Sequence, residues 1–478
     1  MNKRFARYFN QMAILSRIVM NGFKKDDDSI VNILEDTNNE RYTRLLYEVP
    51  EIIQENRCVR EVVLGDLTDH FFEKIEKIIE EGDIYIYFLL LRYMDRAIGR
   101  CFSELINFMD DVEEIERLNT NEAETRVLVF KKTKCYWEYR SINKNLNAHF
   151  CYFYLTDSEK ISEISIHNYL LDENLIMKHG KKTLNIGISP LLKDKVVEFS
   201  APYPRINEES GMVRYYFRVE EVQEEERLAN VILQKILLAG ERDIDILVFP
   251  EMLGTELIRE RIIQQIREEK WKKIPPLIIF PSIWKKTEND GHNTNKSCML
   301  LMGKEVIFEQ DKRKRFHYEK EGHEVYEDIA REKNNVVNIL HVEGIGRIII
   351  VICYDYLQEE NRKMIMENLC PTLVCSPSFS TGSFPFAILK GEFFSRSCNW
   401  VWCNTCSARN ETPEVKRDRN FETIGIITKF SKNCDMQKPL EDSYTGVTKC
   451  QQENCASCIY ETKIPLRVTK EAIREVVE

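Results

Sequence analysis

The segment Ile348-Ile-Ile-Val-Ile-Cys353-Tyr354-Asp355 joins a run of apolar residues to a cysteine and an acid. An apolar run of this length is typical of a buried strand. Cys353 follows the run directly, at the point where a strand would give way to a loop. Because catalytic residues are often carried on loops that a rigid scaffold positions, we predict that this strand end lies in a functional site.

Two earlier segments also place a reactive side chain just after an apolar strand. The run 246–249 is ended by a proline and followed by Glu251. The run 306–308 leads through Glu-Gln-Asp to Lys312, and Lys314 in the same basic run is an alternative to it. Three strand ends, in the order Glu, Lys, Cys, are therefore expected to meet around one pocket.

Strand-like and helix-like segments alternate along the C-terminal three-fifths of the chain. Residues 183–188 form an expected strand, and a helix with a one-sided apolar stripe follows, for which Gly240 is the expected C-terminal stop. Further apolar runs expected as strands are 277–280, 298–302, 373–375 and 400–403. This alternation predicts a layered α/β domain.

Glu251, Lys312 and Cys353 supply the groups that amide hydrolysis needs. The Cys353 thiolate would attack the carbonyl carbon to form a thioester, while Glu251 takes the thiol proton, returns a proton to the leaving amine and then activates water. Lys312 and backbone N–H groups would stabilise the oxyanion, and the lysine charge would favour the reactive state of the thiol. This chemistry requires no metal and no cofactor.

The strand ending in Pro-Glu251, the hairpin leading to Lys312 and the strand ending in Cys353-Tyr-Asp resemble the Glu-Lys-Cys pattern of the nitrilase superfamily. The resemblance covers roughly residues 183–466, apart from a long insert at 191–215. Further matches are Asn295, Ser376-Pro377, Arg396-Ser-Cys-Asn399, Val401-Trp-Cys-Asn404 and the closing segment 459–466.

This resemblance implies a four-layer α-β-β-α sandwich, frequent formation of homo-oligomers, and hydrolysis of amides, carbamoyl compounds or nitriles as small-molecule substrates. It also implies a second glutamate shortly after the lysine. Among Glu319, Glu321, Glu324 and Glu327, the best match is Glu321, which Gly322 follows. Glu321 and Tyr354 are therefore our candidates for the substrate pocket.

Residues 1–182 have a different character and are expected to form an accessory α+β domain that is mainly helical. Apolar residues recur at helical spacing over 71–79, and β-like stretches occur at 126–130 and 149–155. We expect this domain to position a substrate or a protein partner, and the nitrilase-like domain to occupy 183–478.

The composition is that of a soluble globular protein. The chain has 478 residues, of which 43% are hydrophobic and 31% charged, and its net charge of −10 argues against general nucleic-acid binding. The most apolar window, 84–94, is much shorter than the ~20 residues that span a bilayer. The N-terminus has no signal-peptide pattern. We therefore expect a cytoplasmic protein without a membrane segment.

The 15 cysteines are scattered, which favours reduced thiols over disulfides. Two CxxC pairs, Cys403/Cys406 and Cys455/Cys458, raise the question of a zinc site, formed by both pairs or by Cys434, Cys450, Cys455 and Cys458. The spacing is unusual for zinc, and Cys403 and Cys406 fit core packing. We therefore predict no metal.

Two alternatives to the thiol hydrolase remain at this stage. In the first, the domain keeps the fold but acts as a binding or regulatory module with a protein partner docked on residues 1–180. In the second, the chain is a Cys-His hydrolase that uses a histidine such as His317 or His323. Replacing Cys353 by Ala separates the enzyme from the binding module.

Overall fold

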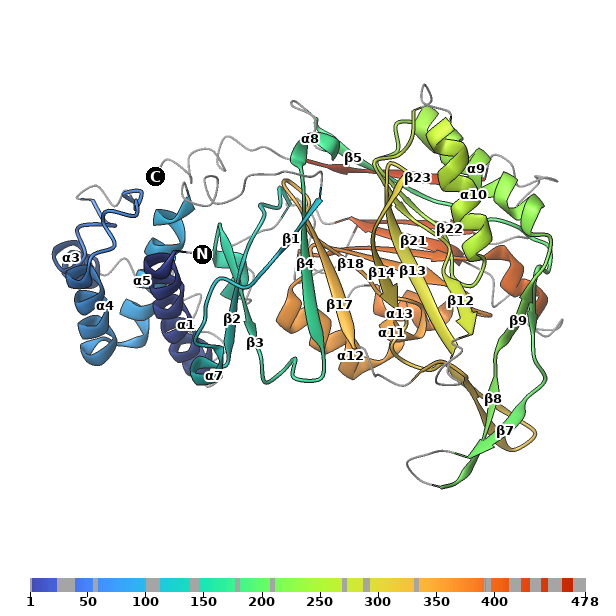
Figure 1. The fold of residues 1–478 in the computed structure, drawn as a ribbon, viewed down its shortest axis with the longest axis horizontal. Helices are drawn as coiled ribbons and strands as arrows, with labels where there is room; N and C mark the ends of the chain where they lie inside the picture. Colours follow the sequence, from blue (N-terminus) through green and yellow to red (C-terminus); the bar gives the residue numbers. More distant parts are fainter. Residues whose placement is uncertain are drawn as a thin grey trace.

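The computed structural model describes residues 2–23, 39–54, 59–99, 112–137, 146–176, 181–206, 211–268, 273–286, 293–330, 335–390, 392, 397–411, 423–429, 440–445 and 458–466. Its secondary structure is mixed α/β (Figure 1). Among these residues, none of the helices combines the length and the apolar character needed to cross a lipid bilayer.

The largest sheet has eight strands and carries Cys353 at the end of one of its central strands. Parallel pairs join β18 to β19 and β19 to β20, while β17 is antiparallel to β18. In spatial order the strands are β1 (Val112–Ile115), β4 (Ser165–Leu171), β17 (Val336–Val342), β18 (Gly346–Ile350), β19 (Leu373–Ser378), β20 (Asn399–Asn404), β21 (Thr423–Lys429) and β22 (Leu440–Thr445).

A second sheet has seven strands. Glu251 lies just after one of them and Lys312 just after another. The closing segment expected at 459–466 pairs antiparallel with the strand expected at 183–188. In order the strands are β12 (Ile283–Lys286), β13 (Asn293–Leu301), β11 (Leu277–Ile279), β10 (Ile246–Val248), β5 (Thr183–Ile188) and β23 (Tyr460–Pro465), with β14 (Glu305–Asp311) beside β13.

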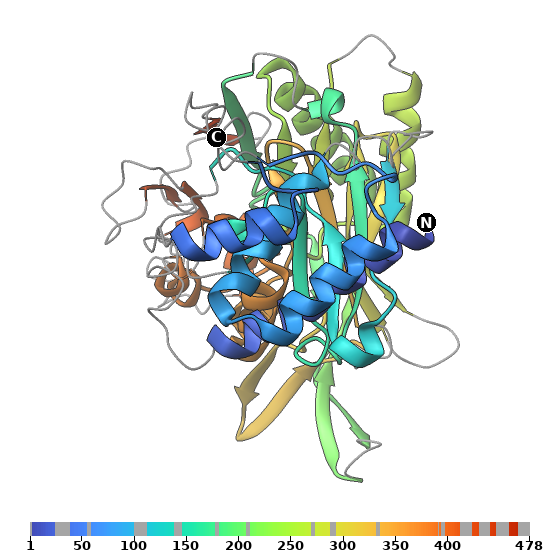
Figure 2. The ribbon, with the colours of Figure 1, turned by 90° about the vertical axis from the view of Figure 1, so that its left-hand side faces the viewer.

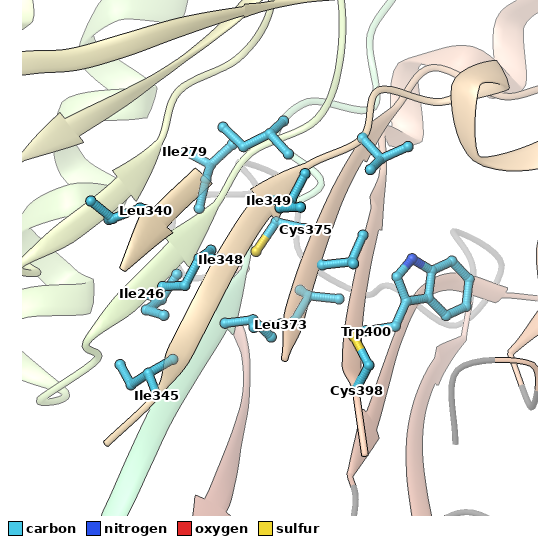
Figure 3. Close-up of a cluster of buried hydrophobic side chains, with 14 of the residues drawn as sticks. Ile246, Ile279, Leu340, Ile345, Ile348, Ile349, Leu373, Cys375, Cys398 and Trp400 are labelled. Carbon is cyan, nitrogen blue, oxygen red and sulfur yellow. The ribbon is translucent and has the colours of Figure 1, made fainter. Parts of the chain in front are cut away.

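The two sheets share one apolar core. Figure 3 shows Ile246 and Ile279 of the seven-stranded sheet close to Leu340, Ile348 and Leu373 of the eight-stranded sheet, and all five are fully buried. Burying each such side chain contributes about 1.5–3 kcal/mol relative to leaving it exposed. The apolar runs that predicted the strands therefore also hold the two sheets together.

Helices α9 (Glu225–Glu241) and α10 (Glu256–Glu268) cover the other face of the seven-stranded sheet. Since side chains alternate along a strand, Leu247 of β10 faces these helices while its neighbours face the other sheet. Helix α9 ends one residue after the predicted stop. A Cβ on Gly240 would lie 1.8 Å from the Lys273 carbonyl oxygen, so only glycine fits there.

Short helices follow β18, β19 and β20 of the eight-stranded sheet. They are α11 (Tyr354–Leu357), α12 (Glu359–Met364), the π-helix η2 (Ile365–Leu369), α13 (Phe384–Leu389) and the 3₁₀ helix η4 (Cys406–Glu411). Two of them dock through aromatic side chains: the Tyr356 ring stacks on Trp400 at 4.5 Å, and Phe386 stacks on Trp402 at 4.7 Å.

The N-terminal segment builds a core of its own at one end of the molecule (Figures 1 and 2). Its elements are α1 (Lys3–Phe23), α3 (Asn39–Glu48), α4 (Asp69–Glu81), α5 (Ile84–Ala97), α7 (Glu122–Thr125), β2 (Val127–Lys131), η1 (Leu146–His149) and β3 (Phe153–Asp157). Helix α8 (Glu173–Ile176) packs instead against the core that the two large sheets share. The pattern at 71–79 thus lies within α4, and β2 and β3 form an antiparallel pair.

Strands β1 and β4, which precede residue 183, belong to the eight-stranded sheet. β4 pairs in parallel with β17 along seven residues, from Ser165 opposite Val336 to Leu171 opposite Val342. The boundary expected between 182 and 183 therefore crosses a continuous sheet. Local sequence patterns do not show this, because strand pairing is a long-range property.

A four-stranded sheet, here called the arm, extends away from the two large sheets (Figures 1 and 2). Its strands, in order, are β15 (His317–Lys320), β16 (His323–Glu327), β8 (Val213–Phe217) and β7 (Tyr203–Ile206). At its base β6 (Val197–Phe199) pairs with β9 (Val219–Val222). The insert at 191–215 thus supplies part of the arm, and β15 and β16 follow Lys312 directly.

Candidate active site

Cys353 lies just beyond β18 and before α11. Its backbone has φ +46° and ψ −107°, a conformation that non-glycine residues rarely adopt. The surroundings hold it: the Cys353 N–H donates to the Pro377 carbonyl at 2.9 Å, and Tyr356 N–H donates to the Cys353 carbonyl. Such strain is frequent at functional sites. The residue is buried, with 6% of its surface exposed.

Lys312 follows β14, and its Nζ atom lies between two carboxylates. The distances are 2.8 Å to Glu251 Oε1 and 2.6 Å to Glu327 Oε2. All three side chains are at most 1% exposed. Burial disfavours the ammonium charge, but the two carboxylates outweigh it and raise the pKa of Lys312 well above its ordinary value. The lysine is therefore a fixed positive charge.

Glu251 follows β10, and each of its carboxylate oxygens accepts a hydrogen bond from a residue other than Lys312. Asn295 Nδ2 donates to Oε1 and the Phe379 backbone N–H donates to Oε2, both at 2.8 Å. The charge of the same carboxylate also raises the pKa of the Cys353 thiol. Glu251 is thus oriented by Lys312, Asn295 and the Phe379 backbone, and it acts electrostatically on the sulfur of Cys353.

The thiol of Cys353 rests in its neutral form. Burial raises its pKa well above the ordinary value, the Glu251 charge raises it further, and Lys312 only partly opposes them. Lys312 therefore lowers the pKa of the thiol, as expected, but not enough to produce a permanent thiolate. A base must take the proton as the sulfur attacks, and Glu251 is in position to do so.

Glu251, Lys312 and Cys353 form a buried cluster to which a second glutamate belongs. This is Glu327, at the end of β16. Besides Lys312, its carboxylate accepts from the Phe316 N–H at 3.0 Å and from Asn295 Nδ2 at 3.3 Å. Burial raises the pKa of Glu327 above its ordinary value. Asn295 therefore donates to both glutamates and fixes the spacing between them.

The structure does not bring Glu321 to this cluster. Glu321 is exposed, with φ +52°, at the turn between β15 and β16. The expectation that it is the second glutamate is thus corrected to Glu327. The spacing from Lys312 along the sequence did not distinguish Glu321 from Glu327. The alternation of buried and exposed side chains along β16 could have done so, because Glu327 is two residues from the buried Val325 and so lies on the same face of the strand.

Asp355 ties the loop that carries Lys312 to the loop that carries Cys353. Its carboxylate accepts from the backbone N–H groups of Arg313, at 2.9 Å, and of Lys314, at 2.6 Å. The Nζ atom that lies against Glu251 belongs to Lys312, so the alternative assignment to Lys314 is not supported. Burial raises the pKa of Asp355 to about 7.

Tyr354 and the two histidines lie farther out, towards the arm. The Tyr354 hydroxyl is 3.2 Å from His317 Nδ1, and His317 also contacts the Tyr326 ring. His323 packs against Tyr215 of β8. Glu251, rather than either of these histidines, is the group whose charge raises the pKa of the Cys353 thiol.

The cysteine pairs add no metal site to the part of the chain that the structure describes. Within it, no three His, Cys, Asp or Glu side chains have an arrangement that could hold a metal ion. Cys403, Cys406 and Cys458 are buried. Cys434, Cys450 and Cys455 lie outside the described residues, so the proposed four-cysteine sets stay untested.

No protein-family model matches the chain, and no curated protein matches it either. Among solved structures it is similar to an amidase from Nesterenkonia sp., with 12% identity and a TM-score of 0.39 over 62% of this chain and 97% of that chain. A mutant of that amidase in complex with butyramide matches at 11% identity, with the same TM-score and coverage.

A further mutant, with acrylamide added at its active-site cysteine, matches at 12% identity and a TM-score of 0.33 over 46% of this chain and 78% of that chain. The neighbours include amidases of the nitrilase superfamily, the family that the sequence resembles. At such low identity and TM-score, these likenesses transfer neither an activity nor a substrate to this chain.

Proposed function

We propose that the chain is a thiol-dependent hydrolase of a non-peptide carbon–nitrogen bond, in an amide or a related group. It would work through Glu251, Lys312 and Cys353, on a four-layer nitrilase-like sandwich whose eight-stranded sheet includes β1 and β4 from the mainly helical α+β N-terminal segment. One observation carries the proposal. Three residues from three strand ends form a single buried cluster, in which Glu251 accepts from the Lys312 ammonium at 2.8 Å and its charge raises the pKa of the Cys353 thiol.

In the first half of the reaction, Cys353 attacks the amide carbon. The carbon–sulfur bond forms while Glu251 takes the thiol proton, and the negative charge moves to the carbonyl oxygen. Lys312 Nζ and backbone N–H groups at the start of α11 would stabilise that oxyanion. The intermediate then collapses, the carbon–nitrogen bond breaks, and Glu251 returns the proton to the leaving amine.

In the second half, water releases the acyl group. Glu251, now ionised again, takes a proton from water as its oxygen attacks the thioester carbon. The carbon–sulfur bond breaks, the sulfur recovers a proton from Glu251, and the carboxylic acid leaves. Each proton that enters or leaves the reacting atoms passes through Glu251, which fits the several hydrogen bonds that orient its carboxylate.

The direct test measures the alkylation rate of each cysteine near neutral pH by mass spectrometry. Cys375 is a control within the same protein, because it is buried and burial raises its pKa to about 12 without a catalytic neighbour. We expect Cys353 to react at least about tenfold faster than Cys375. Glu251→Gln and Lys312→Met should each slow Cys353 by roughly 10²-fold or more, as for the loss of an acid–base or an electrostatic group.

A parallel test follows turnover of a panel of small amides by mass spectrometry. Cys353→Ala should abolish it, and Cys353→Ser should leave at most a small residue of it. If Cys353 is no more reactive than Cys375 and no variant alters alkylation or turnover, the hydrolase proposal fails. The binding or regulatory module, acting with a protein partner, then becomes the better account.

A further inference from the structure

Five aromatic rings form a continuous row beside the cluster, here called the aromatic arc. Each ring meets the next edge to face: Tyr354 and Phe316 at 5.6 Å, Phe316 and Phe217 at 6.4 Å, Phe217 and Phe199 at 5.9 Å, and Phe199 and Phe379 at 5.5 Å. The rings come from α11, the loop before β15, β8, β6 and the loop after β19.

Three members of the arc are attached to three members of the cluster. The Phe379 N–H donates to Glu251 Oε2 at 2.8 Å, and the Phe316 N–H donates to Glu327 Oε2 at 3.0 Å. Tyr354 is the residue after Cys353. The two end rings of the arc and its second ring therefore belong to residues that are bonded to members of the cluster.

The arc is not fully buried. Phe217 is buried, at 7% exposed, whereas Phe316 is 37% exposed. The remaining three rings are of intermediate exposure. The Phe316 ring is thus open to solvent although the backbone N–H of the same residue binds the buried Glu327 carboxylate. Partly open rings beside a reactive thiol offer apolar surface to a bound molecule.

We infer that the site takes amides that carry an aromatic ring, which packs against the arc while the carbonyl carbon lies at Cys353. The inference rests on the proposed hydrolase function and adds the substrate class. Successive rings in the arc meet edge to face, and an aromatic guest can continue this order. Part of the arc comes from the insert at 191–215, so this selectivity would belong to the arm.

The test compares two thiol reagents, 2-chloroacetamide and N-benzyl-2-chloroacetamide. In both, the Cys353 sulfur forms a bond to the chlorine-bearing carbon, the carbon–chlorine bond breaks, chloride leaves with the electron pair, and the thiol proton passes to Glu251. Each rate is divided by the rate of the same reagent with free N-acetylcysteine. The ratio of the two normalised rates then measures recognition of the ring.

We expect a ratio of about ten or more in the wild type, with saturation by the benzyl reagent. Phe316→Leu and, as a second variant at the other end, Phe199→Leu should each lower the ratio roughly 2- to 10-fold, as for the loss of one aromatic pair. The Phe316 substitution retains the backbone N–H that binds Glu327. The matched control is Tyr215→Leu, an arm residue outside the arc, which should leave the ratio unchanged.

The outcomes separate the two proposals. If Cys353 reacts with both reagents at a ratio near one, the aromatic preference is wrong and the hydrolase proposal stands. If the ratio is high but neither Phe316→Leu nor Phe199→Leu lowers it, the arc is not the recognition surface. If Cys353 reacts with neither reagent faster than Cys375 does, the hydrolase proposal fails and this inference fails with it.

Discussion

At the scale of single residues, the main feature of the cluster is that it buries three charged side chains. Glu251, Glu327 and Lys312 leave water completely, and their mutual contacts must offset a desolvation cost of several kcal/mol per ion. One lysine between two carboxylates leaves an excess negative charge, which fits a neutral resting thiol. Removing one of these three charges should therefore also perturb the other two, because each of them is buried and relies on the others to offset its desolvation.

Glu327→Gln tests this coupling. The substitution preserves the shape but removes the charge that helps hold Lys312, so we expect amide turnover to fall by roughly 10²-fold, the usual scale for losing a preorganised electrostatic group. Glu321→Gln is the matched control from the same hairpin and should remain within about twofold of the wild type. Equal effects of the two substitutions would contradict the assignment of Glu327.

Asp355 should make stability depend on pH. Because its pKa in the folded protein is about 7, above the ordinary value of 3.8, the folded state holds this proton more tightly than the unfolded chain does. Its stabilising contribution is complete below about pH 4 and is lost as the pH rises through 7.

Asp355→Asn removes that titration. Between pH 5 and pH 8 the free energy of unfolding of the variant should therefore rise relative to the wild type, by roughly 2–3 kcal/mol at 1.36 kcal/mol per pKa unit. Urea unfolding of both proteins at the two pH values measures the difference. A gap that stays constant would show that Asp355 is ionised in the folded protein throughout this range.

At the scale of elements, side chains at helix starts determine where the N-terminal helices begin. Asp83 precedes α5, and its Oδ1 accepts from the N–H groups of Tyr85 and Ile86, both at 2.9 Å. It satisfies donors that the first turn of a helix leaves without an intrahelical partner. Thr68 plays the same part for α4, where its hydroxyl accepts from Phe71 N–H at 3.2 Å.

Replacing Asp83 by Ala should destabilise α5 by about 1 kcal/mol, within the usual range for a lost N-cap. Hydrogen exchange of the α5 amides should accelerate roughly fivefold, since RT is ~0.6 kcal/mol and local opening becomes easier by that free energy. Asp83→Asn keeps a capping oxygen and should exchange nearly as slowly as the wild type. Similar acceleration in both variants would assign the effect to the lost charge, including the ion pair with Arg41.

At the scale of the whole molecule, the N-terminal segment and the eight-stranded sheet are one structure. β17, which lies next to β18, the strand before Cys353, is paired on its other side with β4. The strand sequence VVNILHV of β17 is mostly apolar. Without β4 its backbone N–H and C=O groups would form an open edge, which is a template for aggregation.

A chain that begins at residue 183 should therefore fail to give a monodisperse folded protein. We expect aggregation in size-exclusion chromatography with light scattering, and loss of the cooperative thermal transition of the full chain. A soluble fragment whose Cys353 is alkylated at the full-length rate would contradict this. It would mean that the two large sheets are stable without β1 and β4.

Some features followed from the sequence alone because they are local. An apolar run and the residue that ends it are neighbours in the chain, so Glu251, Lys312 and Cys353 were placed at strand ends, and the structure has them just after β10, β14 and β18. The helix around 71–79 followed in the same way from its spacing, whereas the closing strand at 459–466 followed from the resemblance to the nitrilase superfamily.

Other features were decided only by tertiary structure, because they depend on which distant strands pair. The pairing of β15 with β16 leaves Glu321 at an exposed turn and places Glu327 against Lys312. The pairing of β4 with β17 joins the two halves of the chain into one sheet. The aromatic arc gathers rings from five separate segments. Spacing along the chain determines where an element ends, whereas long-range pairing and packing determine what that end faces.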